Sequence, residues 1–302
     1  MRFAAAWHAL HRRPRRTRWP LKTGAFLLVA LVVLYPRPWL IPAWLTRLCN
    51  LNAVIDPYHP TVSELAARVT DDAGGKPSLH AAAVAVETLV RQRMPYAFDW
   101  ETWGVMDYLP TVDEAFAQGR EDCDGQAVVA ASVLRRLGYE AWIVSDLLHT
   151  WVVARDPTAQ PPVTVALMSP GRGDQTLTGE SEGTRARFST ATLANVGRAL
   201  SFGVAVFPAE RELVIVAALW LVLMQPRSPG WRRLAGGAVL LAALPCLRSA
   251  GGPVAGDVYR PGLAGLGLAS LAAGCVLLMY KSPPARRGFA ETTSGPPPAS
   301  LC

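Results

Sequence analysis

The sequence predicts an α+β domain joined to transmembrane helices, and two observations favour this fold class. Of the 302 residues, 51% are hydrophobic and only 18% are charged, whereas soluble proteins carry about 25% charged residues. Between residues 48 and 201, predicted helices are followed by predicted antiparallel strands, an order typical of α+β domains. The large apolar fraction excludes a mainly disordered chain, and five cysteines are too few for a disulfide scaffold of this length.

Apolar segments divide the chain into four parts. We expect a basic cytoplasmic tail and a transmembrane anchor in 1–47, the α+β domain in 48–201, about three transmembrane helices in 202–281, and a disordered cytoplasmic tail in 282–302. The anchor run Thr23–Tyr35 follows a cluster of arginines and has no small-x-small cleavage site after it, which favours an uncleaved signal anchor. The formal net charge of +7 is explained by such membrane-flanking residues, so we expect no nucleic-acid partner.

The C-terminal apolar part predicts three further spans, which makes four in total. The runs are Leu213–Met224, with Phe202–Phe207 upstream of it, then Leu234–Leu247, and finally Gly262–Tyr280. By itself, only the last is long enough to cross a hydrocarbon core of about 30 Å. Inside the last run, Gly265, Ala269 and Ala273 recur at every fourth position, and we expect this small-residue stripe to pack within the chain's own bundle.

Basic residues orient these spans. They concentrate in the N-terminal tail, around Arg232 and Arg233, and after Lys281. The positive-inside rule then predicts a multi-pass protein of the inner or plasma membrane, with cytoplasmic termini and the 48–201 domain outside the cytoplasm. The spans contain almost no charged residues, which disfavours a transporter.

Within the domain, residue periodicity predicts three helices and three strands. We expect helices at Leu79–Met94, Val112–Gln118 and Cys123–Leu137, and strands at Glu140–Ser145, His149–Arg155 and Val163–Met168. Thr111 and Glu114 have the spacing of a capping box, and Gly138 is placed to end the third helix.

Cys123 and His149 are the candidate catalytic pair. Cys123 begins a predicted helix, where unpaired N–H groups and the helix dipole favour an anionic thiolate. A helix packed on the sheet can bring its first turn beside the strand that His149 opens, so the imidazole could act as base. Glu121, Asp122 and Asp124 oppose a thiolate, a conflict that is reduced if Asp122 caps the helix and the others face solvent.

The same residues resemble a known family. Asp107–Thr111, Glu114–Phe116 and Gly119–Gly125 look like the approach to the nucleophile in transglutaminase-like domains. Leu134–Ala141 is similar to that family's passage from helix through Leu-Gly to strand, and His149–Val152 resembles its His-x-Trp-Val strand. The resemblance implies a papain-like α+β core and a Cys–His–Asp triad in which Cys123 is the nucleophile and His149 the base.

The third member of such a triad is where this sequence departs from the family, which normally has an Asp on the strand after the His strand. A hairpin here would instead place Met168 or Ser169 opposite His149. Asp156 is the available candidate for orienting His149, although an odd offset puts it on the other face of the strand. Asp174 is a weaker candidate, and the third member could be absent.

These features predict a membrane-bound transglutaminase-like cysteine enzyme that hydrolyses or transfers amide or peptide bonds of a protein or peptide substrate. The alternative is an inactive module that binds peptides or partners in the cell envelope. As second oxyanion donors, beside the Cys123 N–H, we consider Trp103 and Gln118, although Trp103 is also suited to the core. We expect no cofactor and no metal, because no second Cys or His lies at ligand spacing from Cys123.

Overall fold

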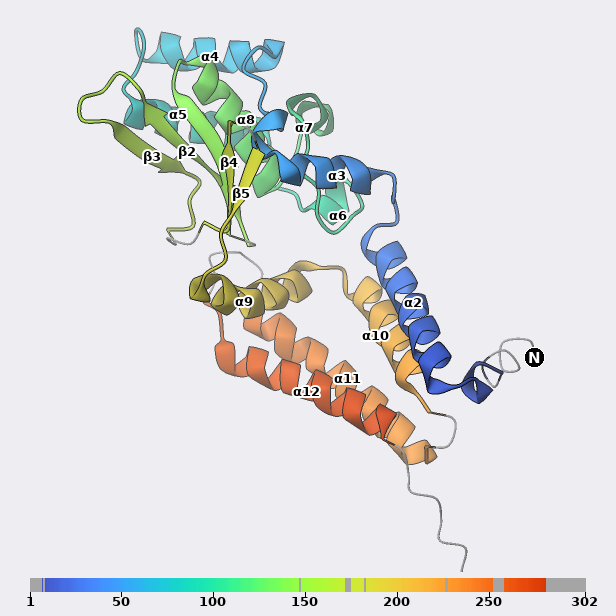
Figure 1. The fold of residues 1–302 in the computed structure, drawn as a ribbon. Coiled ribbons are helices and arrows are strands. Elements are labelled where there is room, and N and C mark those ends of the chain that lie inside the picture. The colour runs from blue at the N-terminus through green and yellow to red at the C-terminus, as the bar shows by residue number, and fades with distance from the viewer. Residues whose placement is uncertain are drawn as a thin grey trace, which may run out of the picture.

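An α+β domain and a group of apolar helices make up the molecule (Figure 1). Helix α9 (Thr190–Val206) lies between the two. The α+β class is confirmed, with a mostly helical chain and a five-stranded antiparallel sheet. The computed structural model describes residues 7, 9–146, 148–171, 175–181, 183–225, 228–251 and 258–280.

The helices of the domain precede its sheet, and α2 (Arg15–Leu34) leads into them. They are α3 (Leu40–Cys49), the short 3₁₀ helix η1 (Leu51–Val54), α4 (Pro60–Asp72), α5 (Leu79–Arg93), α6 (Asp99–Thr102), α7 (Val112–Gln118) and α8 (Cys123–Arg136). The three helices expected from periodicity correspond to α5, α7 and α8, with α7 at its predicted bounds.

The sheet has the strand order β3-β2-β1-β4-β5, and all neighbouring pairs are antiparallel. Its strands are β1 (Glu140–Ser145), β2 (Thr150–Asp156), β3 (Val163–Leu167), β4 (Leu177–Glu180) and β5 (Gly183–Ala186). β1 has the predicted bounds, whereas β2 begins one residue after the expected His149. β4 and β5 add a second edge to the sheet that the apolar alternation of the sequence does not predict.

Helix α8 forms the centre of the domain core. The ten residues from Gly125 to Leu134 are all buried, and the helix contacts α4, α5, β1 and β2. A helix surrounded by protein is apolar around its whole circumference, and the run GQAVVAASVL fits this environment. Because the core holds α8 on all sides, the position of its first residue, Cys123, is fixed relative to the sheet.

Side-chain caps define where α7 and α8 begin. Thr111 Oγ accepts the N–H of Glu114 at 3.3 Å, and Glu114 Oε2 accepts the N–H of Thr111 at 2.8 Å, which is the predicted capping box. Gly119, with φ +69°, ends α7 in the left-handed region that glycine tolerates. Asp122 Oδ1 then accepts the N–H of Asp124 at 2.9 Å and starts α8. Cys123 therefore lies in the first turn, as predicted.

Three of the described helices, α2, α11 (Gly230–Gly251) and α12 (Pro261–Met279), are long and apolar enough to cross a membrane, which indicates a multi-pass membrane protein. The expected fourth span is interrupted. Pro208 has no N–H and disfavours a helical residue before it, so the chain divides into α9 and α10 (Ala209–Leu223). The 15 residues of α10 rise about 22 Å, which is less than a ~30 Å core.

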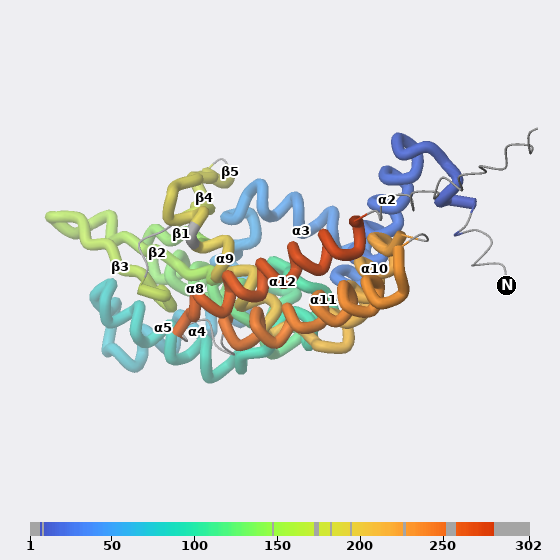
Figure 2. Tube along the Cα trace, turned by 90° about the horizontal axis from the view of Figure 1, so that it is seen from below, coloured from blue at the N-terminus to red at the C-terminus, as the bar shows by residue number. Residues whose placement is uncertain are grey.

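Glycines set the packing of α11 against α12, which lie side by side (Figures 1 and 2). A Cβ on Gly274 would lie 3.1 Å from the carbonyl oxygen of Gly236, and one on Gly267 would lie 2.7 Å from Leu247 Cγ. The predicted stripe is different: Gly265 is exposed, with nothing within 4 Å of an added Cβ. The expected packing role of this stripe is therefore wrong. The glycines of α12 that approach α11 closely are Gly267 and Gly274, seven residues apart, and they lie on a different side of the helix from Gly265.

Polar contacts join the bundle at both ends. Arg248 on α11 forms an ion pair with Glu212 on α10 at 2.7 Å and also donates to the carbonyl oxygens of Ala205 and Phe207 at 3.1 Å. Lys22 on α2 donates to the carbonyl oxygen of Val222 at the C-terminal end of α10. These bonds satisfy backbone carbonyls that a short helix leaves unpaired at its ends.

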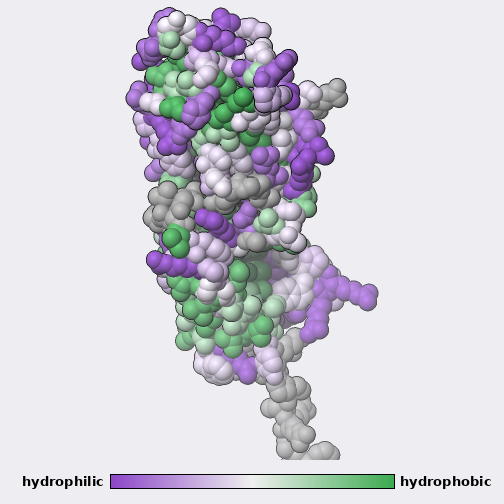
Figure 3. Space-filling model, turned by 90° about the vertical axis from the view of Figure 1, so that its left-hand side faces the viewer, coloured by the Kyte–Doolittle hydropathy of each residue, from purple (hydrophilic) through white to green (hydrophobic). Residues whose placement is uncertain are grey.

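The α+β domain rests on the junction between α9 and α10. Arg211 donates to the carbonyl oxygen of Gly104 at 3.0 Å. The rings of Trp100 and Phe207 meet edge to face, with centroids 6.2 Å apart. Figure 3 shows apolar side chains gathered on the lower part of the molecule, over the bundle, and polar ones over much of the domain. The junction is therefore where the polar and apolar halves of the protein meet.

Candidate functional site

A cavity of about 410 Å³ lies at this junction and contains both predicted catalytic residues. Its wall on the domain side includes Cys123 from α8 and His149 and Thr150 from the start of β2. Its opposite wall is apolar and includes Phe202 and Val206 from α9. The size is that of a small-ligand pocket.

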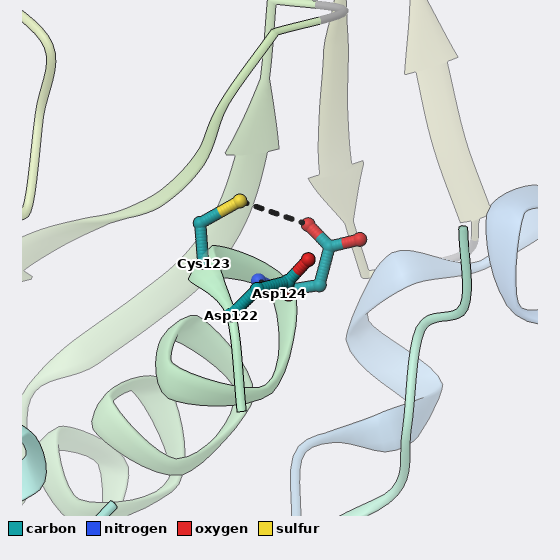
Figure 4. A group of neighbouring side chains, drawn as sticks. All are labelled: Asp122, Cys123 and Asp124. Atoms are coloured by element: carbon teal, nitrogen blue, oxygen red, sulfur yellow. Dashed lines mark hydrogen bonds between the residues drawn. The ribbon is translucent and has the colours of Figure 1, made fainter. Parts of the chain in front are cut away.

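The thiol of Cys123 lies beside the beginning of β2. Its sulfur is positioned to accept a hydrogen bond from the backbone N–H of Thr150, the residue that follows His149. The thiol also donates to Asp124 Oδ1, with 3.7 Å between sulfur and oxygen (Figure 4). The packing of α8 on β2 thus brings the first turn of the helix to the residues around His149.

Five carboxylates surround this thiol. Asp122 and Asp124 flank it in sequence, Glu121 precedes them, and Asp99 and Asp107 come from the segment around α6. Ligand atoms lie within 4.8 Å of one another in each of three groups: Asp122 with Cys123 and Asp124, Asp99 with Glu121 and Asp122, and Asp99 with Asp107 and Asp124. We call these five residues the acidic cluster.

Burial and mutual repulsion keep protons on the acidic cluster. Burial raises the pKa of Asp107 and of Asp124 to about 7, with a further contribution from the neighbouring carboxylates. The same causes raise the pKa of Glu121 and of Asp122 to about 8. The pKa of Asp99 is raised well above its ordinary value, first by burial and then by Asp122. At neutral pH several of these groups are therefore proton donors.

The same surroundings raise the pKa of the Cys123 thiol well above its ordinary value, first through burial and then through Asp122 and Asp124. Asp122 caps the helix as expected, but the other two acids do not face solvent. Glu121 is fully buried, and Asp124 points toward the sulfur (Figure 4). The N–H of Thr150 and the helix N-terminus offset this repulsion only in part.

His149 is oriented by main-chain and turn contacts. Its Nε2 lies 2.7 Å from the carbonyl oxygen of Met168. The backbone N–H of His149 donates to Asp146 Oδ1 at 3.0 Å, and Asp146 is fully buried. A carbonyl can only accept, so Nε2 carries a proton. In the neutral ring the lone pair is then on Nδ1, which is the nitrogen able to take a proton from a thiol.

The structure does not bring Asp156 to this site. Its carboxylate is at the far end of β2 and accepts bonds from the N–H and hydroxyl of Thr158. Seven residues of extended strand separate it from His149, roughly 23 Å. The carbonyl of Met168 instead contacts Nε2 of the imidazole. The predicted hairpin register is off by one or two residues, because β2 pairs Val152 with Leu167 and this register continues to residue 170 opposite His149. Asp174 lies outside the described residues.

The oxyanion donors considered from the sequence are engaged elsewhere. Trp103 Nε1 donates to Glu121 Oε1 at 3.1 Å, and its ring packs against Tyr108. Gln118 is exposed on α7. Tyr96, which the sequence patterns do not single out, lines the cavity. The pKa of its hydroxyl is raised by burial and by the nearby charge of Cys123 and Asp122, so this hydroxyl is a proton donor available to the site.

The acidic cluster is the main feature that sequence reasoning missed. Asp107 belongs to the motif that carries the family resemblance, which is a signal that it lies near Cys123. Asp99 precedes Cys123 by 24 positions (123 − 99) and carries no such signal. Carboxylates this close could hold a hard divalent cation such as Mg²⁺ or Ca²⁺, so the expectation of no metal stays a prediction.

No protein-family model, curated protein or solved structure matches this chain. The fold family named for the sequence motifs therefore stays a resemblance, and functional reasoning depends on the geometry of the cavity.

Proposed function

We propose that the protein is a membrane-bound, transglutaminase-like cysteine enzyme that cleaves or transfers amide bonds. The observation that carries the proposal is the shared cavity of Cys123 and His149, in which the sulfur lies beside the backbone N–H of Thr150. The triad would be completed by the carbonyl of Met168 in place of an Asp. From the charge asymmetry we infer that the α+β domain lies outside the cytoplasm at an inner or plasma membrane, with cytoplasmic termini. Both termini lie on one side only if the number of crossings is even, so in this proposal α10 and its flanking residues also cross the membrane.

The chemistry divides into two half-reactions. The thiol proton passes to Nδ1 of His149 as sulfur attacks the amide carbonyl carbon. The tetrahedral intermediate collapses, the C–N bond breaks, and the amine leaves with the proton that His149 returns. Water or a second amine then attacks the thioester, with His149 again taking and returning a proton. The N–H of Cys123 and the hydroxyl of Tyr96 are suited to stabilise the oxyanion.

The acidic cluster gives this site an unusual resting state. Because the pKa of Cys123 is raised, the thiol is neutral at rest, and proton transfer must accompany attack rather than precede it. The protonated acids supply donors close to the leaving group. We expect hydrolysis over cross-linking, since water is the default acceptor.

A second candidate is a module without turnover that binds peptides or envelope partners in the same cavity. The raised pKa of Cys123 favours it. The two candidates differ in whether Cys123 forms a covalent intermediate.

The test is trapping of that intermediate. The full chain in detergent is incubated with a panel of peptide amides, amine release is measured, and the acyl-enzyme is sought by intact mass. Cys123→Ala and His149→Ala should each lower turnover by at least about a thousandfold without lowering the melting temperature. Cys49→Ala, an exposed thiol outside the cavity, is the matched control. Binding that persists in Cys123→Ala, with no adduct in the wild type, would support the inactive module instead.

A further inference from the structure

The apolar wall of the cavity belongs to a helix with three distinct faces. Helix α9 presents Ala199, Phe202, Gly203 and Val206 to the cavity, which is the i, i+3, i+4, i+7 spacing of one helix side. A second side packs on α11, where a Cβ on Gly251 would lie 2.2 Å from the carbonyl oxygen of Ser201.

The third side of α9 is apolar and exposed. Leu193, Val196 and Leu200 are 74%, 50% and 45% exposed, and they lie between the cavity side and the packed side. Helix α9 lies between the polar domain and the apolar α11–α12 pair (Figure 1). An exposed apolar helix side in a multi-pass membrane protein is suited to contact lipid, and the cavity lies on the adjacent side of the same helix.

The cavity lining combines two chemical kinds of side chain. Asp99, Asp107, Asp122 and Asp124 of the acidic cluster line it together with Cys123 and His149. Apolar side chains line it as well, among them Leu48, Leu51, Met106, Phe202 and Phe207, and we call these the acyl-chain half of the lining. A peptide amide would leave these apolar side chains without a matching partner, whereas a hydrocarbon chain would pack against them.

We propose that the substrate of Cys123 is a long-chain N-acyl amide drawn from the membrane, whose acyl chain lies against Phe202 and Val206. The inference rests on the proposed thiol chemistry and names its substrate class. The acyl group is transferred to sulfur in the first half-reaction and leaves it in the second, so the apolar wall holds the part of the substrate that is present in both. The departing amine becomes an ammonium ion at neutral pH. Asp107 and Asp124 line the same cavity and, with pKa values of about 7, are ionised in part at this pH, so they are suited to bind it.

Gly203 offers a way to fill the acyl-chain half alone. It faces the cavity, and a Cβ added to it would meet nothing within 4 Å. Gly203→Trp should occupy the space along α9 and leave Cys123 accessible. Gly203→Leu is a smaller second variant, used if the tryptophan lowers the melting temperature. Leu200→Trp, on the exposed side of the same helix, is the matched control.

The experiment measures chain-length dependence without relying on turnover. Methyl and dodecyl methanethiosulfonate convert a thiol to a mixed disulfide and release methanesulfinate. Their rates are measured by intact mass at pH 9 on the full chain in lipid nanodiscs, with Cys123 as the sole cysteine. For the Cys123 chain, the rate with the dodecyl reagent is divided by the rate with the methyl reagent. The same ratio is measured for a chain that retains only Cys49. Dividing the first ratio by the second gives a corrected ratio, from which partitioning of the reagent into lipid has been removed.

We expect this corrected ratio to be at least about tenfold for Cys123, because burial of a few methylene groups suffices for that factor. Gly203→Trp should reduce it to about one while the methyl reagent reacts at a rate within about twofold of wild type, and Leu200→Trp should leave it unchanged. A corrected ratio near one in the wild type, or one that Gly203→Trp does not lower, overturns the proposal. If chain dependence holds but no amide is turned over, the enzyme proposal fails and the acyl-chain site stands. If short peptide amides are turned over and the corrected ratio shows no chain dependence, the enzyme proposal stands and the acyl-chain site is rejected.

Discussion

The α+β domain and the helical bundle are held together by different means. In the domain, Ile143, Trp151 and Leu134 are packed around α8 with almost no exposed surface, so removal of apolar area from water drives the packing. In the bundle, Gly236, Gly267 and Gly274 let α11 and α12 approach closely, because lipid tails are as apolar as leucine and only tight contact favours association.

This difference explains where the polar chemistry is placed. A core of β-branched and aliphatic residues excludes charge, and a bilayer excludes it as well. The described acidic side chains with raised pKa values around Cys123 lie between the two, at the first turn of α8 and in the α6 segment. The junction is thus the position at which the protein holds reactive polar groups in a cavity between its polar and apolar halves.

The largest effect should come from the domain core. Ile143→Ala removes a fully buried side chain from the central strand β1, and such a change costs about 2–5 kcal/mol. Amide hydrogen exchange measured in denaturant should show that β1 and β2 lose protection from exchange, while α11 and α12 keep their protection. Equal loss of protection in both regions would mean that the domain and the bundle unfold as one unit.

In the bundle, added volume should matter more than lost volume. Gly267→Leu places a side chain where a Cβ alone would lie 2.7 Å from Leu247 Cγ, and overpacking of this kind costs about 1–3 kcal/mol. Gly265→Leu is the control, because nothing lies within 4 Å of its Cβ. The melting temperatures of the Gly267→Leu and Gly265→Leu variants are measured by thermal unfolding in detergent. If Gly265→Leu is the more harmful change, the small-residue stripe of the sequence is an interface after all.

The pH dependence of stability should be confined to the domain. The pKa of Asp107 is about 7 in the folded chain, and its ordinary value is 3.8. The unfolded chain therefore loses this proton at lower pH than the folded chain does, and the folded state becomes less stable as pH rises from about 4 to 7. Asp107→Asn, which mimics the protonated acid, should be more stable than wild type at pH 8, on the order of 1–2 kcal/mol.

Melting temperatures recorded between pH 4 and 8 check this expectation, since the two proteins should agree at pH 4 and diverge above it. The alkylation midpoint of Cys123 is a second readout and should move to lower pH in Asp107→Asn. A wild-type stability that rises through this interval would contradict the assigned pKa.

The smallest effect should come from helix caps. Thr111→Ala removes the hydroxyl that accepts the Glu114 N–H and should cost about 1 kcal/mol. Arg260, at the corresponding position before α12, makes no side-chain cap bond, so Arg260→Ala should leave stability unchanged. The free energies of unfolding of the two variants are compared by chemical denaturation. Equal losses of stability would show that both regions depend on capping.

Local signals predicted three of the described domain helices, α5, α7 and α8, and the strands β1, β2 and β3, but not α4 or α6. The capping box at Thr111 and Glu114 and the alternation of Glu140–Ser145 involve neighbours in sequence, and α7 and β1 have their predicted bounds. β4 and β5, with the sequences LTGE and GTRA, have no apolar alternation, and they become strands because the edge of β1 needs partners. Hydropathy alone does not register the break that Pro208 imposes between α9 and α10.

At the site, the sequence indicated Cys123, His149 and the acids adjacent to Cys123 in sequence, but not Asp99 and Asp107. Their shared cavity depends on α8 packing against β2, which periodicity anticipates. The approach of Asp99 and Asp107 depends on how an irregular segment folds back over the first turn of α8, and no local pattern specifies this. Asp156 was a candidate only through its position after the His strand, and the length of β2 carries it away from His149.

The Arg248–Glu212 ion pair has a consequence for biogenesis. Glu212 lies on α10, which is too short and too charged to enter a bilayer stably by itself. Its counterion is on α11, so the neutralising arginine emerges from the ribosome only after most of the following helix has been made. We therefore expect α10 and α11 to enter the bilayer together, as a hairpin in which the ion pair is already formed.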